Sequence, residues 1–206
     1  MDNKVTLYGA SGHGKVIIDI LESMGVGIAT VLDDNPNLKV LLTYPISKPT
    51  AVDTVDGSSV IISIGNNRVR KALSQKMNCI FAQAIHPTAI LSKHSRLGEG
   101  TVVMAGAVIN PATTIGAHCI INTGAVVEHD CVIADFVHLS PNVSLAGNVH
   151  VMEGAHIGIG ASIIQGVRIG KWATIGAGSV ILKDVPDYAV VVGNPGKIIK
   201  YTTIDE

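Results

Sequence analysis

The sequence predicts two domains of different fold class: an α/β Rossmann-like domain over residues 1–84 and an all-β parallel β-helix over residues 85–206. Three observations carry this prediction. An aliphatic residue recurs at every sixth position from Ile85 to Ile181. Residues 1–84 lack this repeat and alternate short apolar segments with segments of helical period. Hydrophobic residues make up 47% of the chain but aromatic residues only 3%, so the core must consist of small aliphatic side chains in regular layers.

The six-residue repeat predicts a triangular coil. Because six is an even number, each aliphatic anchor and the residue four positions later can face the same side of a short strand. The residue at that second position is small or β-branched throughout, which suits a tight corner, and three units give a coil of about 18 residues. Cys119 and Cys131 occupy this second position, so we expect them to pack rather than react. The glycines that follow several anchors are expected to supply backbone freedom at the bends. The anchors are Ile85, Leu91, Leu97, Val103, Ile109, Ile115, Ile121, Val127, Ile133, Leu139, Leu145, Val151, Ile157, Ile163, Ile169, Ile175 and Ile181.

The first domain reads as strand, helix, strand, strand, helix. Strands are expected at residues 5–8, 29–32 and 60–64, with one helix over residues 16–24 and another ending at residue 77. Residues 40–54 are expected to be rich in loops. Alternation of strands and helices with short connections predicts a small parallel sheet.

A cluster of glycine or polar residues follows each of these three strands. In Gly9-Ala-Ser-Gly-His-Gly14, the backbone around Ser11, Gly12 and His13 could hold a phosphate at the helix N-terminus. The motif is neither GxGxxG nor a P-loop, and a tight turn without ligand is the alternative. Asp33 and Asp34 could bond a ribose or a uracil edge, or cap a loop. Gly65 opens the third cluster. Because ligands of such sheets bind at the carboxyl ends of strands, we expect all three clusters to line one site.

In the β-helix, His129 is the candidate general base. It lies two residues after an anchor, at an outward or corner position, between Glu128 and Asp130. A carboxylate beside a neutral imidazole orients the ring and supports the imidazolium that forms on proton uptake. The sequence leaves open which of the two carboxylates does so.

The 18-residue coil predicts the neighbours of the histidines. Gly147 lies one coil beyond His129, where its N–H could stabilise an oxyanion. His138 and His156 are also 18 residues apart and should stack. His118, His150 and His156 are interpreted as ordinary solvated surface side chains.

Composition excludes several functions. The net charge of −1, without a basic run, does not favour nucleic acid or anionic membranes as partners. There is no long apolar span and no signal peptide, and the three cysteines lack CxxC spacing, so we expect a cytoplasmic protein.

Several motifs occur together in order: Gly9-Ala-Ser-Gly-His-Gly14, Leu32-Asp-Asp34, Ile64-Gly-Asn-Asn-Arg68, Asn122, Val127-Glu-His-Asp130, Phe136-Val-His138 and Gly193-Asn-Pro-Gly-Lys197. In these the chain resembles the bacterial sugar O- and N-acetyltransferases of the sialic acid and bacillosamine pathways. This family belongs to the hexapeptide-repeat superfamily, whose coils wind left-handed. The resemblance implies a left-handed β-helix, acetyl-CoA as co-substrate, no metal, and a homotrimer with active sites between subunits.

The resemblance also implies residue roles. His129 matches the catalytic base, and Asp130 matches the acidic residue that raises its basicity, where a family member of this type carries Glu. The positions that match nucleotide-sugar contacts are Ser11, Gly12, His13, Asp33, Asp34 and Gly65. The positions that match acetyl-CoA contacts are His138, Ile159 and Ala177.

We therefore expect an N-acetyltransferase that acetylates the 4-amino group of a UDP-linked amino-dideoxy sugar, with catalytic residues His129, Asp130 and Gly147. One alternative is an O-acetyltransferase acting on a sialic acid or another sugar. Another is a non-catalytic nucleotide-sugar-binding scaffold. A zinc hydratase of the γ-carbonic-anhydrase type needs two histidine ligands separated by four residues, whereas successive coil histidines here are 11, 9, 12 and 6 positions apart.

Overall fold

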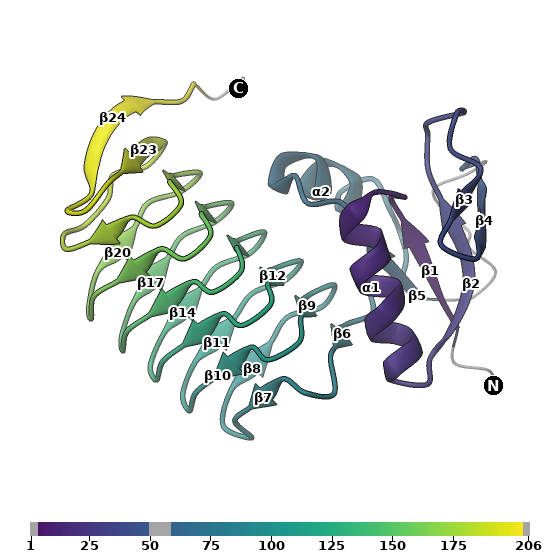
Figure 1. Cartoon of the computed structure of the whole chain (residues 1–206), viewed down its shortest axis with the longest axis horizontal. Coiled ribbons are helices and arrows are strands. Elements are labelled where there is room, and N and C mark those ends of the chain that lie inside the picture. Colours follow the sequence, from purple (N-terminus) through teal and green to yellow (C-terminus); the bar gives the residue numbers. More distant parts are fainter. Residues whose placement is uncertain (1–3, 50–58, 204–206) are drawn as a thin grey trace.

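The computed structural model describes residues 4–49 and 59–203. An α/β domain packs against one end of a long β-helix (Figure 1). The boundary between residues 84 and 85 stays a prediction. Within the described ranges, no helix combines the length and the apolar character needed to cross a bilayer.

The first domain is a five-stranded sheet in the order β3-β4-β2-β1-β5. Strand β1 lies between β2 and β5 and pairs in parallel with both, as the sequence predicts. Residues 40–47, expected to be loop-rich, instead form a hairpin that extends the sheet, because Ile46 pairs beside Val31 and Val40 pairs with Pro45 at the edge. Residues 50–54 of that stretch lie outside the described residues. Helix α1 begins earlier than expected and α2 ends earlier. The elements are β1 (Lys4–Tyr8), α1 (Gly12–Ser23), β2 (Gly27–Leu32), β3 (Val40–Leu41), β4 (Tyr44–Ser47), β5 (Ser59–Ile62) and α2 (Asn67–Ser74).

The second part is a parallel β-helix with three flat faces. Each two-residue strand from β6 to β22 ends on a predicted anchor, and residues 18 apart pair in register, as Ile109 does with Val127. The β-helix predicted from the repeat, and its left-handed winding implied by the family resemblance, are confirmed. The first face contains β7 (Ile90–Leu91), β10 (Val108–Ile109), β13 (Val126–Val127), β16 (Ser144–Leu145), β19 (Ser162–Ile163) and β22 (Val180–Ile181). The second face contains β8 (Arg96–Leu97), β11 (Thr114–Ile115), β14 (Val132–Ile133), β17 (His150–Val151) and β20 (Arg168–Ile169). The third face contains β6 (Ala84–Ile85), β9 (Val102–Val103), β12 (Ile120–Ile121), β15 (His138–Leu139), β18 (His156–Ile157), β21 (Thr174–Ile175), β23 (Ala189–Val192) and β24 (Lys197–Tyr201).

The corners of the coil work differently from the prediction in one respect. Cys119 and Cys131 are fully buried among the aliphatic anchors, so their packing role is confirmed. The glycines directly after an anchor, however, do not supply the left-handed backbone. Positive φ angles fall two residues further on, as at Gly100 and Asp130. A Cβ on Gly98 would lie 2.5 Å from the backbone N of Ala117 on the next coil, so that glycine is there because two coils approach closely.

The α/β domain packs on the third face of the β-helix. There the outward residues of the first three strands, Ala84, Val102 and Ile120, are buried in the same apolar cluster as helix α1. Further along the same outward column come His138, His156 and Thr174. The column therefore changes from apolar to polar where the cover of α1 ends, and this change marks the candidate site.

Candidate functional site

The strand ends of the α/β domain are joined by hydrogen bonds around the glycine-rich turn. The Asp33 carboxylate accepts hydrogen bonds from the backbone N–H groups of Ala10 (2.7 Å) and Asn35 (2.8 Å). The Ser63 hydroxyl donates to the carbonyl of Gly9 at 2.6 Å. Both oxygens of Asp33 are thus engaged with the backbone, so Asp33 shapes the glycine-rich turn.

Asp34 lies beside the same turn and accepts a hydrogen bond from the Tyr8 hydroxyl at 2.9 Å. Burial, followed by this hydrogen bond, raises the pKa of Tyr8 to about 12. Tyr8 therefore stays protonated and acts as a donor, leaving Asp34 with further acceptor capacity for a ligand.

His13 and His138 meet between the two domains. Burial, followed by the charge of Arg70, lowers the pKa of His13 to about 4. Burial, followed by the charges of His156, Arg70 and His13, lowers the pKa of His138 to about 3. In the described part of the chain, His13 Nε2 is buried without a hydrogen-bond partner, whereas His138 lies against the backbone of Gly65. Both rings are neutral at pH 7, and His13 keeps an unused polar atom for a ligand.

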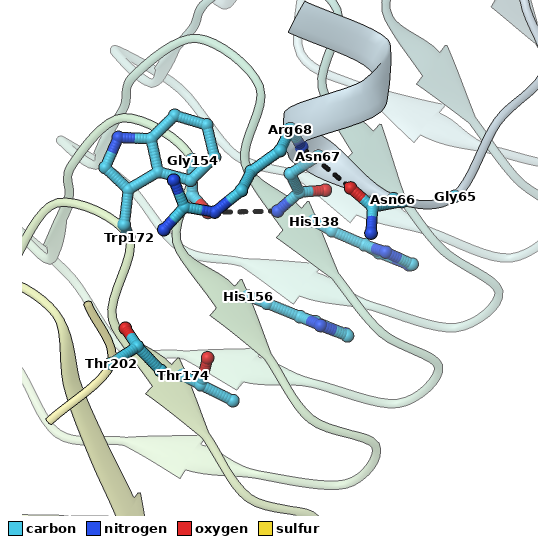
Figure 2. A pocket seen from close by; sticks show the side chains of 10 residues that line it. All are labelled: Gly65, Asn66, Asn67, Arg68, His138, Gly154, His156, Trp172, Thr174 and Thr202. Carbon is cyan, nitrogen blue, oxygen red and sulfur yellow. Dashed lines mark hydrogen bonds between the residues drawn. The ribbon is translucent and has the colours of Figure 1, made fainter. Parts of the chain in front are cut away.

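A pocket of about 460 Å³ opens between α2 and the third face (Figure 2). The rings of His138 and His156 stack in it, with centroids 4.7 Å apart and planes 5° apart, which confirms the predicted stacking. Asn122 contacts His138 Nε2 at 3.2 Å, and Ser140 contacts His156 Nε2 at 2.9 Å. The lining residues are Gly65, Asn66, Asn67, Arg68, His138, Gly154, His156, Trp172, Thr174 and Thr202.

Two histidines differ from their interpretation as surface side chains. His156 is accessible, but it faces the pocket. His118 is only 4% exposed and packs between Phe81 and Phe136, with its ring parallel to that of Phe136 at 5.3 Å. The sequence suggests surface positions for both because it does not show where the α/β domain docks.

His129 lies at an exposed corner, between the first and second faces. Its Nδ1 is 2.7 Å from Asp130 Oδ2, so Asp130 rather than Glu128 orients the ring. The side chain of His129 is 62% exposed. Its position is therefore open to a substrate or to a second chain.

Gly147 stacks on His129 as the 18-residue count predicts. The N–H of Asn148 donates to the carbonyl of His129 at 2.9 Å, which fixes the two coils in register. A Cβ on Gly147 would lie 2.6 Å from Cε1 and 2.9 Å from Nε2 of the imidazole. Only glycine leaves room for the ring in this position. Within residues 4–49 and 59–203, the Gly147 N–H donates no hydrogen bond.

The predicted site residues therefore form separate groups in one chain. The strand-end clusters and His138 meet at the third face. Ile159 and Ala177 follow third-face strands and lie on adjacent coils at the corner leading to the first face. His129, Asp130 and Gly147 lie at the next corner. Among the described residues, no three His, Cys, Asp or Glu side chains are arranged to hold a metal ion.

Arg68 belongs to the third strand-end cluster, but sequence reasoning missed Arg70, Trp172, Thr174 and Thr202. Thr174 could have been found, because it lies 18 residues after His156. The single tryptophan could also have been placed, since Trp172 follows His118, Phe136 and Gly154 at the same spacing. Thr202 carries no comparable signal.

Together, the β-helix, the sheet that packs on it and the polar pocket between them define the class of hexapeptide-repeat acyltransferases. Residues 4–77 match the family model of the PglD N-terminal domain, and residues 94–129 and 148–183 match the bacterial transferase hexapeptide (six repeats). The chain belongs to the family of sugar N-acetyltransferases that combine these two parts.

Three relatives illustrate this family. A histidine-to-alanine variant of GDP-perosamine N-acetyltransferase from Caulobacter crescentus, solved with CoA and GDP-perosamine, is 40% identical. The match covers 96% of this chain and 97% of that one, with a TM-score of 0.91. The acetyltransferase domain of PglB from Neisseria gonorrhoeae, solved with acetyl coenzyme A, is 32% identical over 97% of this chain and 100% of that one, with a TM-score of 0.89. UDP-N-acetylbacillosamine N-acetyltransferase from Bacillus subtilis is 45% identical over 110 residues, or 49% of this chain and about half (51%) of that relative.

The neutral buried histidines predict acid-sensitive stability. The folded-state pKa values of His13 and His118 (about 4) and of His138 (about 3) lie below 6.5. Between pH 6.5 and the folded-state pKa values, the unfolded chain therefore binds more protons than the folded chain. The contribution of these histidines to the free energy of unfolding is fully present above pH 6.5 and decreases as the pH is lowered. We expect a loss on the order of 1 kcal/mol per histidine for each pH unit across that window.

Urea unfolding at pH 7, 6 and 5 measures this slope. His118→Phe is the matched control, because Phe136 occupies the equivalent corner one coil further on with the same left-handed backbone. This variant should show a smaller slope, and an unfolding free energy that does not change from pH 7 to 5 in the wild type would contradict the prediction.

Proposed function

We propose that the protein transfers the acetyl group of acetyl-CoA to the amino group of a nucleotide-linked amino sugar, specifically the 4-amino group of a UDP-linked amino-dideoxy sugar. One observation carries the proposal. His13 and Gly65 lie beside His138 of the His138–His156 stack, in a chain similar over nearly its whole length to an enzyme solved with CoA and a nucleotide-linked sugar.

The arrangement suggests how the two substrates bind. Ser11, Gly12, His13, Asp34 and Gly65 would contact the nucleotide sugar at the carboxyl ends of the strands. Asp33 supports them by holding the turn through Ala10. Acetyl-CoA would lie along the corner with Ile159 and Ala177 and reach His138. Ile159 is 53% exposed, which leaves it available to the pantetheine chain.

The proposed reaction is direct acyl transfer. The sugar amine attacks the thioester carbonyl, and its proton passes to Nε2 of His129. Asp130 accepts from the Nδ1–H, which fixes this tautomer and stabilises the imidazolium. The oxyanion of the tetrahedral intermediate accepts a hydrogen bond from the Gly147 N–H. The intermediate then expels the CoA thiolate, which takes the proton from His129.

This mechanism requires a second chain. In one chain, His129 lies between the first and second faces, whereas the pocket lies on the third face. We therefore propose a homotrimer in which His129 of one chain completes the site of the next. The cysteines Cys79, Cys119 and Cys131 are all unpaired, which supports a cytoplasmic location.

The test is a CoA thiol-release assay across UDP-, GDP- and dTDP-linked amino sugars. Sugars with a hydroxyl in place of the amine are the matched controls. We expect release with a UDP-linked 4-amino sugar and none with its hydroxyl analogue. The GDP-linked sugars are included because the named relatives include enzymes of both kinds. Preference for a GDP-linked sugar would leave the proposed reaction in place but overturn the nucleotide assignment.

The same assay separates the alternatives. An O-acetyltransferase would acetylate a sialic acid and ignore the amino sugars. A scaffold would bind nucleotide sugars in calorimetry and release no thiol with any acceptor. Either result would overturn the proposal.

A further inference from the structure

We propose that Arg70 is a positioning residue of the acetyl-transfer site, which holds the Gly65 loop in place over the His138–His156 stack. This inference rests on the proposed function and deepens it. Arg70 belongs to α2, and its guanidinium lies beneath the pocket without lining it.

The guanidinium of Arg70 connects the two domains. It is 1% exposed. Within the α/β domain, Nη1 donates to the carbonyls of Ile64 (3.0 Å) and Gly65 (3.2 Å). Toward the β-helix, Nε donates to the carbonyl of His118 (2.8 Å) and Nη2 to that of Phe136 (3.0 Å). One side chain thus fixes the Gly65 loop relative to two consecutive coils.

A neighbour extends the same pattern by one coil. Asn67 accepts from Arg70 Nη2 at 2.8 Å and donates to the carbonyl of Gly154 at 3.0 Å. His118, Phe136 and Gly154 are 18 residues apart and share a left-handed backbone, with φ of 53°, 60° and 68°. Arg70 and Asn67 therefore bind three successive turns of one corner, which sets the height of the Gly65 loop along the β-helix.

These contacts need arginine. Its planar fork offers five N–H donors in fixed directions, whereas lysine has three donors on one atom. All the acceptors described are neutral, and burial lowers the pKa of Arg70 to about 10, so it is charged at pH 7. A buried charge without a carboxylate partner is a poor source of stability. The buried guanidinium of Arg70 is better explained by the position in which it holds the Gly65 loop.

The charge of Arg70 also acts on the site. The titratable groups that face it are His13 on α1, and His118, Cys119, His138 and His156 on the β-helix. Its charge favours the neutral form of the four histidines, and burial keeps the pKa of the Cys119 thiol raised despite this charge. A positive charge beneath the pocket favours a bound diphosphate as well. The charge acts both on His13, which the proposed function assigns to the nucleotide sugar, and on His138, which it assigns to acetyl-CoA. A variant that keeps the charge therefore isolates the effect of the loop position.

The test is Arg70→Lys, which keeps the charge but loses the fork. We expect the KM for the nucleotide sugar to rise about 10-fold or more, the equivalent of one or two lost hydrogen bonds to a charged group. The KM for acetyl-CoA and kcat should stay within about 3-fold, because loop position affects sugar binding first.

Glu153→Gln is the matched control for a merely structural role. Glu153 lies on the β-helix and forms an ion pair with Lys71, which belongs to α2 as Arg70 does. The pair helps dock α2 but does not involve the Gly65 loop. This variant should lower Tm and leave the KM for the nucleotide sugar unchanged. If Arg70→Lys changes only Tm, as Glu153→Gln does, the proposal is wrong. If Arg70→Lys does not fold, Asn67→Ala is measured instead. It should raise the KM for the nucleotide sugar by a smaller factor of about 3, and an unchanged KM overturns the proposal.

The outcome is separable from that of the proposed function. If the wild-type enzyme acetylates no acceptor, the proposed function fails. Calorimetric titration with UDP and GDP then still compares the wild type with Arg70→Lys. Weaker nucleotide binding by the variant supports the role in placing the Gly65 loop, and equal binding overturns it.

Discussion

Replacing His129 with alanine is expected to lower kcat by about 10²- to 10⁴-fold, the range for loss of a general base. The side chain is 62% exposed, and among the described residues its one hydrogen-bond partner is Asp130. Its removal leaves no cavity, so Tm and both KM values should stay close to those of the wild type. Steady-state kinetics and thermal unfolding measure the two effects separately. A variant with wild-type kcat would show that His129 is not the base.

A mixing experiment tests where His129 acts. The His129→Ala chain lacks the base but keeps its pocket, and a His138→Ala chain lacks a pocket residue but keeps its base. If each site combines one chain's pocket with the next chain's His129, co-expressed mixed trimers recover activity. Random assembly gives about a quarter of the wild-type sites. No recovery in purified mixed trimers would place the base and the pocket in the same chain.

The β-helix could be predicted from the sequence in detail because its contacts repeat. Each anchor pairs with the residue 18 positions away, and no insertion interrupts the run from Ile85 to Ile181. Counting residues therefore gives spatial neighbours directly. The contact of Gly147 with His129 and the stacking of His138 on His156 follow from that count, and the structure has both.

The pocket could not be predicted in the same way, since it depends on how the domains dock. The sequence predicts a helix that ends at residue 77, but nothing local shows that the partners of Arg70 are the carbonyls of His118 and Phe136. Those carbonyls are accessible because the left-handed corners leave them outside the ladder of the sheets. The burial of His118 has the same origin. Contacts between coils follow from the residue spacing in the sequence, whereas contacts between the two domains do not.

Replacing Gly147 with alanine is expected to lower kcat by about 10²-fold, although alanine keeps the backbone N–H. The new Cβ would lie 2.6 Å from Cε1 of His129, so the imidazole must move. A displacement of about 1 Å of a catalytic group costs a factor of this size. Gly147 is not among the residues with positive φ, so alanine can adopt its backbone and the effect comes from the side chain alone. Rates measured at saturating substrate report it.

The double variant Gly147→Ala, His129→Ala provides the control. All three of the nearest atoms to the new Cβ belong to the His129 ring, so the alanine at position 147 should be harmless once the ring is absent. The double variant should then match His129→Ala in both kcat and Tm, and the coupling between the two sites should nearly cancel the cost of the glycine substitution. If Gly147→Ala lowers the His129→Ala rate by a further 10²-fold, the cost does not come from the contact with the histidine, and the absence of a side chain at position 147 instead leaves room for the acyl group. Because the N–H survives in both variants, the comparison measures the space that Gly147 gives to the ring without disturbing its donor to the oxyanion.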